Sequence, residues 1–89
     1  MKQADETDVD IICKIENACF FDPWGEDTVR LMLKSPFVKV FYSVEPSDGV
    51  TPVSYLVIGQ TDCVEIMKIA VMPSYRRQNF GTECLRHAL

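Results

Sequence analysis

Hydrophobic residues recur at spacings of three and four between Val9 and Cys19, which predicts an amphipathic helix over this range. We expect Asp8 to be its N-cap, because a short acidic side chain can accept hydrogen bonds from the free N–H groups of the first turn. A second, shorter helix is predicted from residue 28 to about Lys34, where a Ser-Pro pair stops it. The apolar faces of these helices consist of Val9, Ile11, Ile12, Ile15 and Cys19, and of Val29, Met32 and Leu33.

Three stretches rich in β-branched and aromatic residues follow, and they predict strands at residues 37–44, 52–58 and 63–71. Short turns with Pro, Gly and Asp residues separate them. Connections this short require antiparallel neighbours, so the strands should form a β-meander. The last strand alternates imperfectly, with Val64, Ile66 and Lys68 on one side. It becomes wholly apolar at residues 69–71, where we expect it to be fully buried.

Length and composition favour an ordinary globular protein with at most one small domain. The chain has 89 residues, of which 47% are hydrophobic and 25% are charged. Its net charge of -4 argues against a general nucleic-acid-binding protein, which needs a basic face. The charge is uneven: acidic residues crowd residues 1–16, whereas Lys68, Arg76, Arg77 and Arg86 fall in the last third.

The cysteines predict neither a metal site nor a secreted disulfide framework. They form no C-x-x-C pair, and His87 is the single histidine, so a zinc site is not expected. The N-terminus lacks the apolar core of a signal peptide, and no apolar run approaches the roughly 20 residues of a membrane span. We therefore expect a cytoplasmic protein with reduced, mostly buried thiols at Cys13, Cys19, Cys63 and Cys84.

The last third of the chain has the order strand, Pro-marked break, basic loop and amphipathic helix from about Phe80. The free N–H groups of a first helical turn and the positive end of the helix dipole would both face such a loop. Arg76 and Arg77 add two permanent charges with forked donors suited to phosphate. These residues predict a binding site for a phosphorylated ligand at residues 76–82.

The same loop carries a family resemblance. Arg76-x-x-Asn79-x-Gly81 resembles the coenzyme-binding Arg/Gln-x-x-Gly-x-Gly/Ala loop of the GNAT superfamily of acyl-CoA-dependent N-acyltransferases. Asn79 stands where the family has its first loop glycine, and Asn is the next best residue for a left-handed conformation. The resemblance implies that acetyl-CoA, with no metal, is the co-substrate. The implied contacts come from Ile69, Ala70, Val71, Arg76, Arg77, Gln78, Asn79, Phe80, Gly81 and Thr82.

An aromatic segment at residues 20–25 ends the first predicted helix. Clustered aromatics most often anchor a loop, but rigid amphipathic rings also suit the wall of a substrate groove. Ile15-Glu16 followed by the Phe-x-Pro-Trp sequence of this segment resembles the bacterial ribosomal-protein-alanine N-acetyltransferase group. The resemblance implies that Phe21, Pro23 and Trp24 line the entrance for a peptide or protein N-terminus, and a small-molecule amine is the alternative acceptor.

The resemblance also implies the fold: an α/β (α+β), GNAT-like domain with two N-terminal helices, an antiparallel β-meander, the coenzyme loop and a helix. It covers residues 1–89 but only about the first half of a family domain. The catalytic acid and base are expected downstream of Leu89, so no catalytic residue is assigned and the C-terminal half of the fold is expected to be absent. Such a truncated chain would be an inactive portion of an N-acetyltransferase or a non-catalytic CoA-binding fragment. Its uncovered sheet edge would favour self-association.

Overall fold

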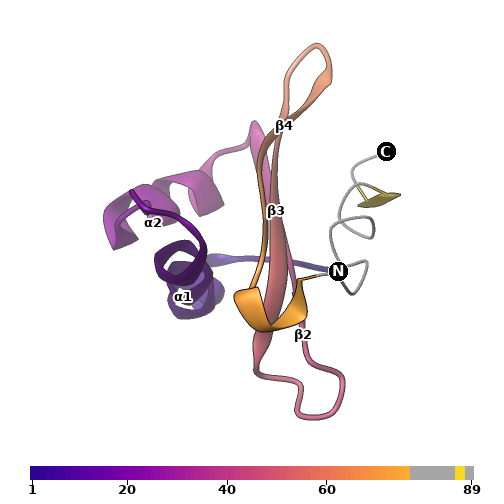
Figure 1. The fold of residues 1–89 in the computed structure, drawn as a ribbon. Coiled ribbons are helices and arrows are strands. Elements are labelled where there is room, and N and C mark those ends of the chain that lie inside the picture. Colours follow the sequence, from indigo (N-terminus) through magenta and orange to yellow (C-terminus); the bar gives the residue numbers. More distant parts are fainter. Residues whose placement is uncertain (77–85, 88–89) are drawn as a thin grey trace.

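An antiparallel sheet with helices packed on one face makes up the described part of the chain. The computed structural model describes residues 1–76 and 86–87. Within these residues, four strands are arranged in the order β1-β2-β3-β4, and both helices lie on the same side of the sheet (Figure 1). The strands are β1 Lys2–Gln3, β2 Val38–Val44, β3 Pro52–Gln60 and β4 Val64–Val71, and the helices are α1 Val9–Cys19 and α2 Glu26–Lys34.

The predicted β-meander is confirmed, and strand β1 was not foreseen. β2, β3 and β4 pair antiparallel in chain order, with Tyr42 opposite Tyr55 and Tyr55 opposite Ala70. β1 adds to the free side of β2, where Lys2 lies opposite Tyr42. Two polar residues carry no hydrophobic alternation, so sequence periodicity could not reveal this strand.

Both predicted helices are present, but Asp8 does not cap α1 with its side chain. A 3₁₀ turn, η1 (Glu6–Asp8), precedes α1, and its N-cap is Asp5. The Asp8 carboxylate accepts hydrogen bonds from the Tyr42 hydroxyl at 2.7 Å and from the backbone N–H of Asp5 at 3.0 Å. This carboxylate thus joins the start of α1 to β2. Burial raises the pKa of the Tyr42 hydroxyl, and its hydrogen bond to Asp8 acts in the same direction.

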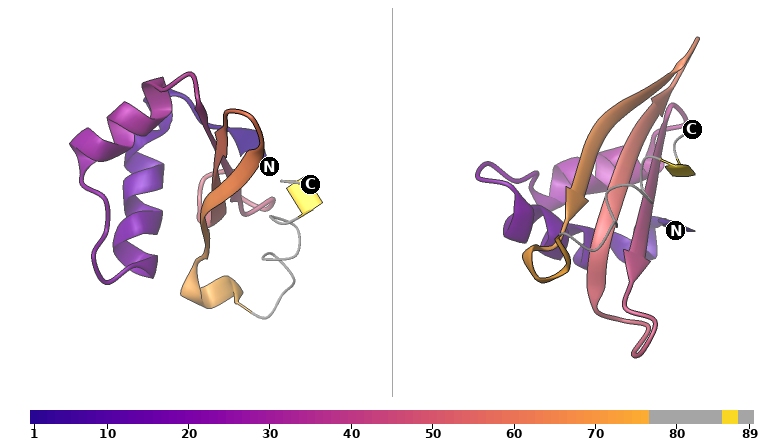
Figure 2. Two further views of the ribbon diagram at one scale, coloured as in Figure 1. Left: turned by 90° about the horizontal axis from the view of Figure 1, so that it is seen from above. Right: turned by 45° about the vertical axis from the view of Figure 1, so that its right-hand side comes forward.

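Both helices lie on one face of the sheet (Figure 2), and residues of the helices and the sheet together form the main core. A smaller cluster on the opposite face contains Leu56 and Ile58, with Met1 and Phe41 packed against them. The rings of Phe41 and His87 are in edge contact there, 4.5 Å between centroids. The main core consists of Ala4, Val9, Ile12, Ile15, Val29, Val40, Tyr42, Tyr55, Val57 and Ala70.

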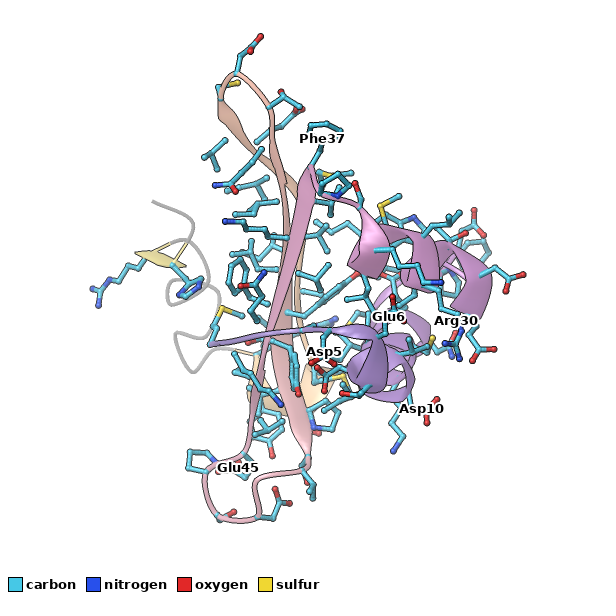
Figure 3. The ribbon with its side chains drawn as sticks, turned by 180° about the vertical axis from the view of Figure 1, so that it is seen from behind. Asp5, Glu6, Asp10, Arg30, Phe37 and Glu45 are labelled. Carbon is cyan, nitrogen blue, oxygen red and sulfur yellow. The ribbon has the colours of Figure 1, made fainter. Side chains whose placement is uncertain are left out.

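The turn between β2 and β3 has the predicted Asp-Gly chemistry. The Asp48 carboxylate accepts hydrogen bonds from the backbone N–H groups of Val50 and Thr51. Gly49 has a φ of 70°, a left-handed conformation that glycine adopts without steric cost. Glu45 marks this end of the sheet, and Phe37 lies at the other end, near α2 (Figure 3).

Strand β4 differs from its prediction in two ways. Its pairing with β3 shifts between Val57 and Ile58, which marks a bulge. Lys68 therefore lies opposite Val57 on the helix-covered face, whereas the alternation predicted that it shares a face with Ile66. The expected full burial of residues 69–71 is wrong, because Ile69 is 37% exposed and Val71 is only half-buried. In the described part of the chain β4 pairs only with β3, which leaves its other side open.

One of the described cysteines is more exposed than the sequence predicts. Cys13 and Cys19 are half-buried and Cys63 is exposed, so the expectation of mostly buried thiols fails at Cys63, which precedes β4 in a turn.

Among residues 1–76 and 86–87, no group of His, Cys, Asp or Glu side chains could hold a metal ion. None of the helices described there is long and apolar enough to cross a membrane.

Candidate functional site

The coenzyme site predicted from the sequence begins at the C-terminal end of β4. A 3₁₀ turn, η2 (Pro73–Tyr75), follows the strand and carries the chain to Arg76. The Arg76 Nε–H donates to the carbonyl oxygen of Val71 at 3.1 Å, so this guanidinium folds back over the end of β4. Of the predicted coenzyme residues, Ile69, Ala70, Val71 and Arg76 therefore lie together. Residues 77–82, which complete the predicted loop, lie outside the described residues.

The C-terminal end of helix α1 contacts the same end of β4. The Cys19 thiol donates to the Val71 carbonyl at 3.5 Å, so Cys19 and Arg76 share one acceptor. Cys19 also lies 4.0 Å from the sulfur of Met72. Burial raises the pKa of the Cys19 thiol, which disfavours the nucleophilic thiolate. Cys19 thus packs the end of α1 onto β4 and is not a candidate nucleophile.

A buried ion pair connects α1 to the middle of β4. Glu16 has no exposed surface, and its carboxylate oxygens accept hydrogen bonds from the Lys68 ammonium at 2.9 and 3.0 Å. The backbone N–H of Trp24 donates to the same carboxylate at 2.7 Å. Lys68 is one of the basic residues of the last third, but in the structure it pairs with this buried carboxylate. The bulge in β4 turns its side chain toward the helices, where Glu16 neutralises it.

The aromatic segment divides into an inward and an outward part. The Lys68 ammonium lies 3.8 Å from the ring centroid of Trp24 and 4.3 Å from that of Phe20, distances typical of cation–π contacts. The Phe20 ring also makes an edge contact with Tyr55, 6.5 Å between centroids. Phe21 is fully exposed. Among the predicted acceptor residues, Trp24 is thus fixed beside β4, whereas Phe21 projects into solvent.

A hollow of about 620 Å³ lies at the opposite edge of the sheet from β4. Its charged lining comes from two lysines and two aspartates, and its walls include the turn between β2 and β3. Among the residues that the structure describes, none of those predicted to bind coenzyme or acceptor lines it. The hollow is therefore not the candidate site. Its charged residues are Lys2, Asp8, Asp10 and Lys14.

Comparison with solved structures shows which class of protein has this arrangement. The fold matches an N-acetyltransferase, the ribosomal-protein-S18-alanine N-acetyltransferase from Escherichia coli, with a TM-score of 0.83 and 23% identity. The match covers 97% of this chain and 54% of that one. The acetyltransferase (GNAT) family profile matches residues 9–89, and the chain belongs to this family. Comparison with curated proteins gave no match.

Two further structures share the fold, and one of them is named for a different acceptor. The aminoglycoside antibiotic 6'-N-acetyltransferase AAC(6')-IG from Acinetobacter haemolyticus matches with a TM-score of 0.78 and 18% identity, over 98% of this chain and 66% of that one. Arabidopsis thaliana NAA60, solved with a bisubstrate analogue, matches with a TM-score of 0.76 and 9% identity, over 97% and 62%. The chain thus spans about half to two thirds of the length of these structures, and the predicted GNAT-like fold is confirmed.

Proposed function

We propose that the chain is the coenzyme-binding, N-terminal portion of an N-acetyltransferase that transfers acetyl from acetyl-CoA to the α-amine of a protein N-terminus. The observation that carries the proposal is the convergence at β4. Strand β4 has one unpaired side, and the turn after it brings Arg76 back to the carbonyl of Val71. The aromatic segment packs beside the same strand through the contact of Trp24 with Lys68. One strand can thus offer backbone groups to a coenzyme arm while the residues at 20–24 border an acceptor.

The proposed chemistry is direct transfer. The lone pair of a neutral amine attacks the thioester carbonyl carbon, the carbon–sulfur bond breaks, the amine loses a proton, and CoA leaves as its thiol. A backbone N–H of β4 would stabilise the oxyanion, while binding holds the two reactants at attack distance. A backbone N–H group on the unpaired side of β4 suits this role, because the strand already holds it in a fixed orientation when the negative charge develops. No residue of this chain is assigned as the acid or base that moves the protons.

Exposed Phe21 supports a protein acceptor in place of a small amine. A fully exposed aromatic ring beside the half-buried Trp24 gives an apolar surface that a peptide can cover. A ribosomal protein alanine is the acceptor we favour, because the similar E. coli structure is named for that substrate. An aminoglycoside-like amine is the second candidate, because a structure of comparable similarity carries that name. Titration with an N-terminal alanine peptide and with an aminoglycoside, in the presence of CoA, distinguishes them.

The coenzyme loop gives the first test. We expect Arg77→Ala to weaken CoA binding by about 1–3 kcal/mol, roughly 5- to 150-fold, because a charge-assisted hydrogen bond to phosphate is lost. Calorimetry with the 89-residue chain measures the effect. Arg30→Ala is the matched control, since Arg30 is an exposed arginine paired with Glu26 on α2. Equal affinities in the wild type and Arg77→Ala would remove the loop from the site.

Asn79 gives a second, independent test of the loop. If its backbone is left-handed, Asn79→Gly should keep or tighten CoA binding, whereas Asn79→Val should weaken it because a β-branched residue resists that conformation. The dissociation constants of the two variants provide the comparison. A crystal structure with Asn79 in a right-handed helical conformation would contradict the assignment.

A further inference from the structure

We propose that Glu16 and Lys68 are positioning residues, which hold Trp24 at a fixed place against strand β4. Their role in acetyl transfer rests on the proposed function, because it assumes that Trp24 borders the acceptor. Their role in holding residues 21–24 in place is independent of the proposed function. Neither residue belongs to the coenzyme loop or to the predicted acceptor contacts, and the two are 52 positions apart in the sequence.

The first step is the burial of Glu16. A carboxylate without exposed surface in an apolar interior costs several kcal/mol unless donors surround it. Here three hydrogen bonds do so, two from Lys68 and one from the backbone of Trp24. The carboxylate therefore has directed bonds to two separate parts of the chain, β4 and the segment between α1 and α2. Its position on the rigid helix α1 fixes both.

The second step is the enclosure of the Lys68 ammonium. The carboxylate of Glu16 lies on one side of this cation, and the rings of Phe20 and Trp24 lie within 4.3 and 3.8 Å of it. The Lys68 side chain is only 17% exposed, so water screens these attractions weakly. Displacement of the Trp24 ring would therefore weaken its contact with a buried cation. The backbone of residue 24 and its ring are thus held by one ion pair.

The third step is the lack, in the described part of the chain, of other hydrogen bonds to this segment, whose Trp24 side chain also packs against the main core. Phe21 is fully exposed, and the N-cap of α2, Gly25, has no side-chain hydrogen bond. Among the described residues, the bond from Trp24 to Glu16 is the hydrogen bond that ties residues 21–24 to the body of the protein. Breaking the pair should therefore move Trp24 while leaving α1 and the sheet in place.

The decisive variant is Glu16→Met/Lys68→Met. It removes both charges and the acceptor of the Trp24 N–H bond but keeps the two side chains close to their original size, so no charge is left buried alone and the chain should remain folded. Lys39→Met is the matched control, because Lys39 is an exposed lysine on β2. Lys68→Arg tests rescue, since a guanidinium can restore both the charge and the bonds to Glu16.

The readouts are the amide resonance of Trp24 and the fluorescence of this residue, which is the single tryptophan of the chain. We expect both signals to shift in the double variant, to stay at wild-type values in Lys39→Met, and to return toward them in Lys68→Arg. Affinity for an N-terminal alanine peptide in the presence of CoA should fall at least about tenfold in the double variant, as for other buried aromatic contacts.

A folded double variant with the wild-type Trp24 signals would overturn the proposal. Changed signals with unchanged peptide affinity would overturn the link to the acceptor and leave the pair as a purely structural device. If the wild-type chain binds CoA but no peptide, the proposed acceptor fails, while the Trp24 signals still decide whether Glu16 and Lys68 position the segment.

Discussion

The 89-residue polypeptide is expected to show no acetyl transfer to an N-terminal alanine peptide, even at concentrations of acetyl-CoA that saturate it. A coenzyme strand and loop can bind and orient the thioester, but the amine must lose a proton and the thiolate must gain one. General acid and base groups contribute about 10²–10⁴-fold each to such steps. No such group is assigned among the residues predicted to bind coenzyme or acceptor, and the chain spans 54% of the E. coli enzyme that shares its fold.

The measurement is the release of free CoA thiol from acetyl-CoA, with light scattering on the same sample. The open side of β4 and its exposed apolar residues, such as Ile66 and Ile69, favour association, so scattering above the monomer value is expected. A complete enzyme that shares the fold, assayed in parallel, serves as the positive control. Robust turnover by a monomer of these 89 residues would show that the catalytic groups lie within the chain.

Lys68→Met is expected to destabilise the fold by about 3–5 kcal/mol, because it leaves the carboxylate of Glu16 buried without its charged partner. The methionine keeps the apolar contacts of the side chain with Phe20 and Trp24, so the loss measures mainly the missing ammonium. Small domains are typically stable by only about 5–15 kcal/mol, so this one substitution should remove a large share of the stability, and nearly all of it at the lower end of that range. Urea denaturation followed by circular dichroism gives the free energy of unfolding.

Lys39→Met, an exposed lysine changed in the same way, should leave the urea midpoint almost unchanged. Glu16→Met/Lys68→Met should recover most of the stability that the single variant loses, because no charge then remains buried. A Lys68→Met protein as stable as the wild type would mean that Glu16 reaches water or another donor.

The sequence predicted the elements whose signals are local. Apolar spacing located α1 at its observed bounds, and β-branched stretches located β2, β3 and β4 to within a few residues. The loop motif also predicted the family that the profile match confirms. The prediction was wrong where pairing across the fold decides the outcome. The bulge in β4 moves Lys68 to the opposite face of the sheet from the predicted one. The alternation of residues along one strand does not show where its pairing with a neighbouring strand shifts.

The candidate site was likewise predicted only in part. Local sequence identified the end of β4 and Arg76, because a basic residue after a strand is visible along the chain. Glu16 was noted only as part of a motif, and its pairing with Lys68 could not be found, because 52 residues separate the partners. A charged residue on the apolar face of a predicted helix, next to Ile15, was the available signal that such a partner exists.

The central claim is that these residues form the coenzyme-binding part of an N-acetyltransferase, and a titration with CoA followed by amide resonances tests it most directly. CoA should shift the amides of Ile69, Ala70, Val71 and residues 76–82 along one saturating curve. The amides that line the hollow at the opposite edge, such as that of Lys14, should not move. Saturating CoA that leaves residues 69–82 unchanged, or that shifts the hollow, would contradict the account.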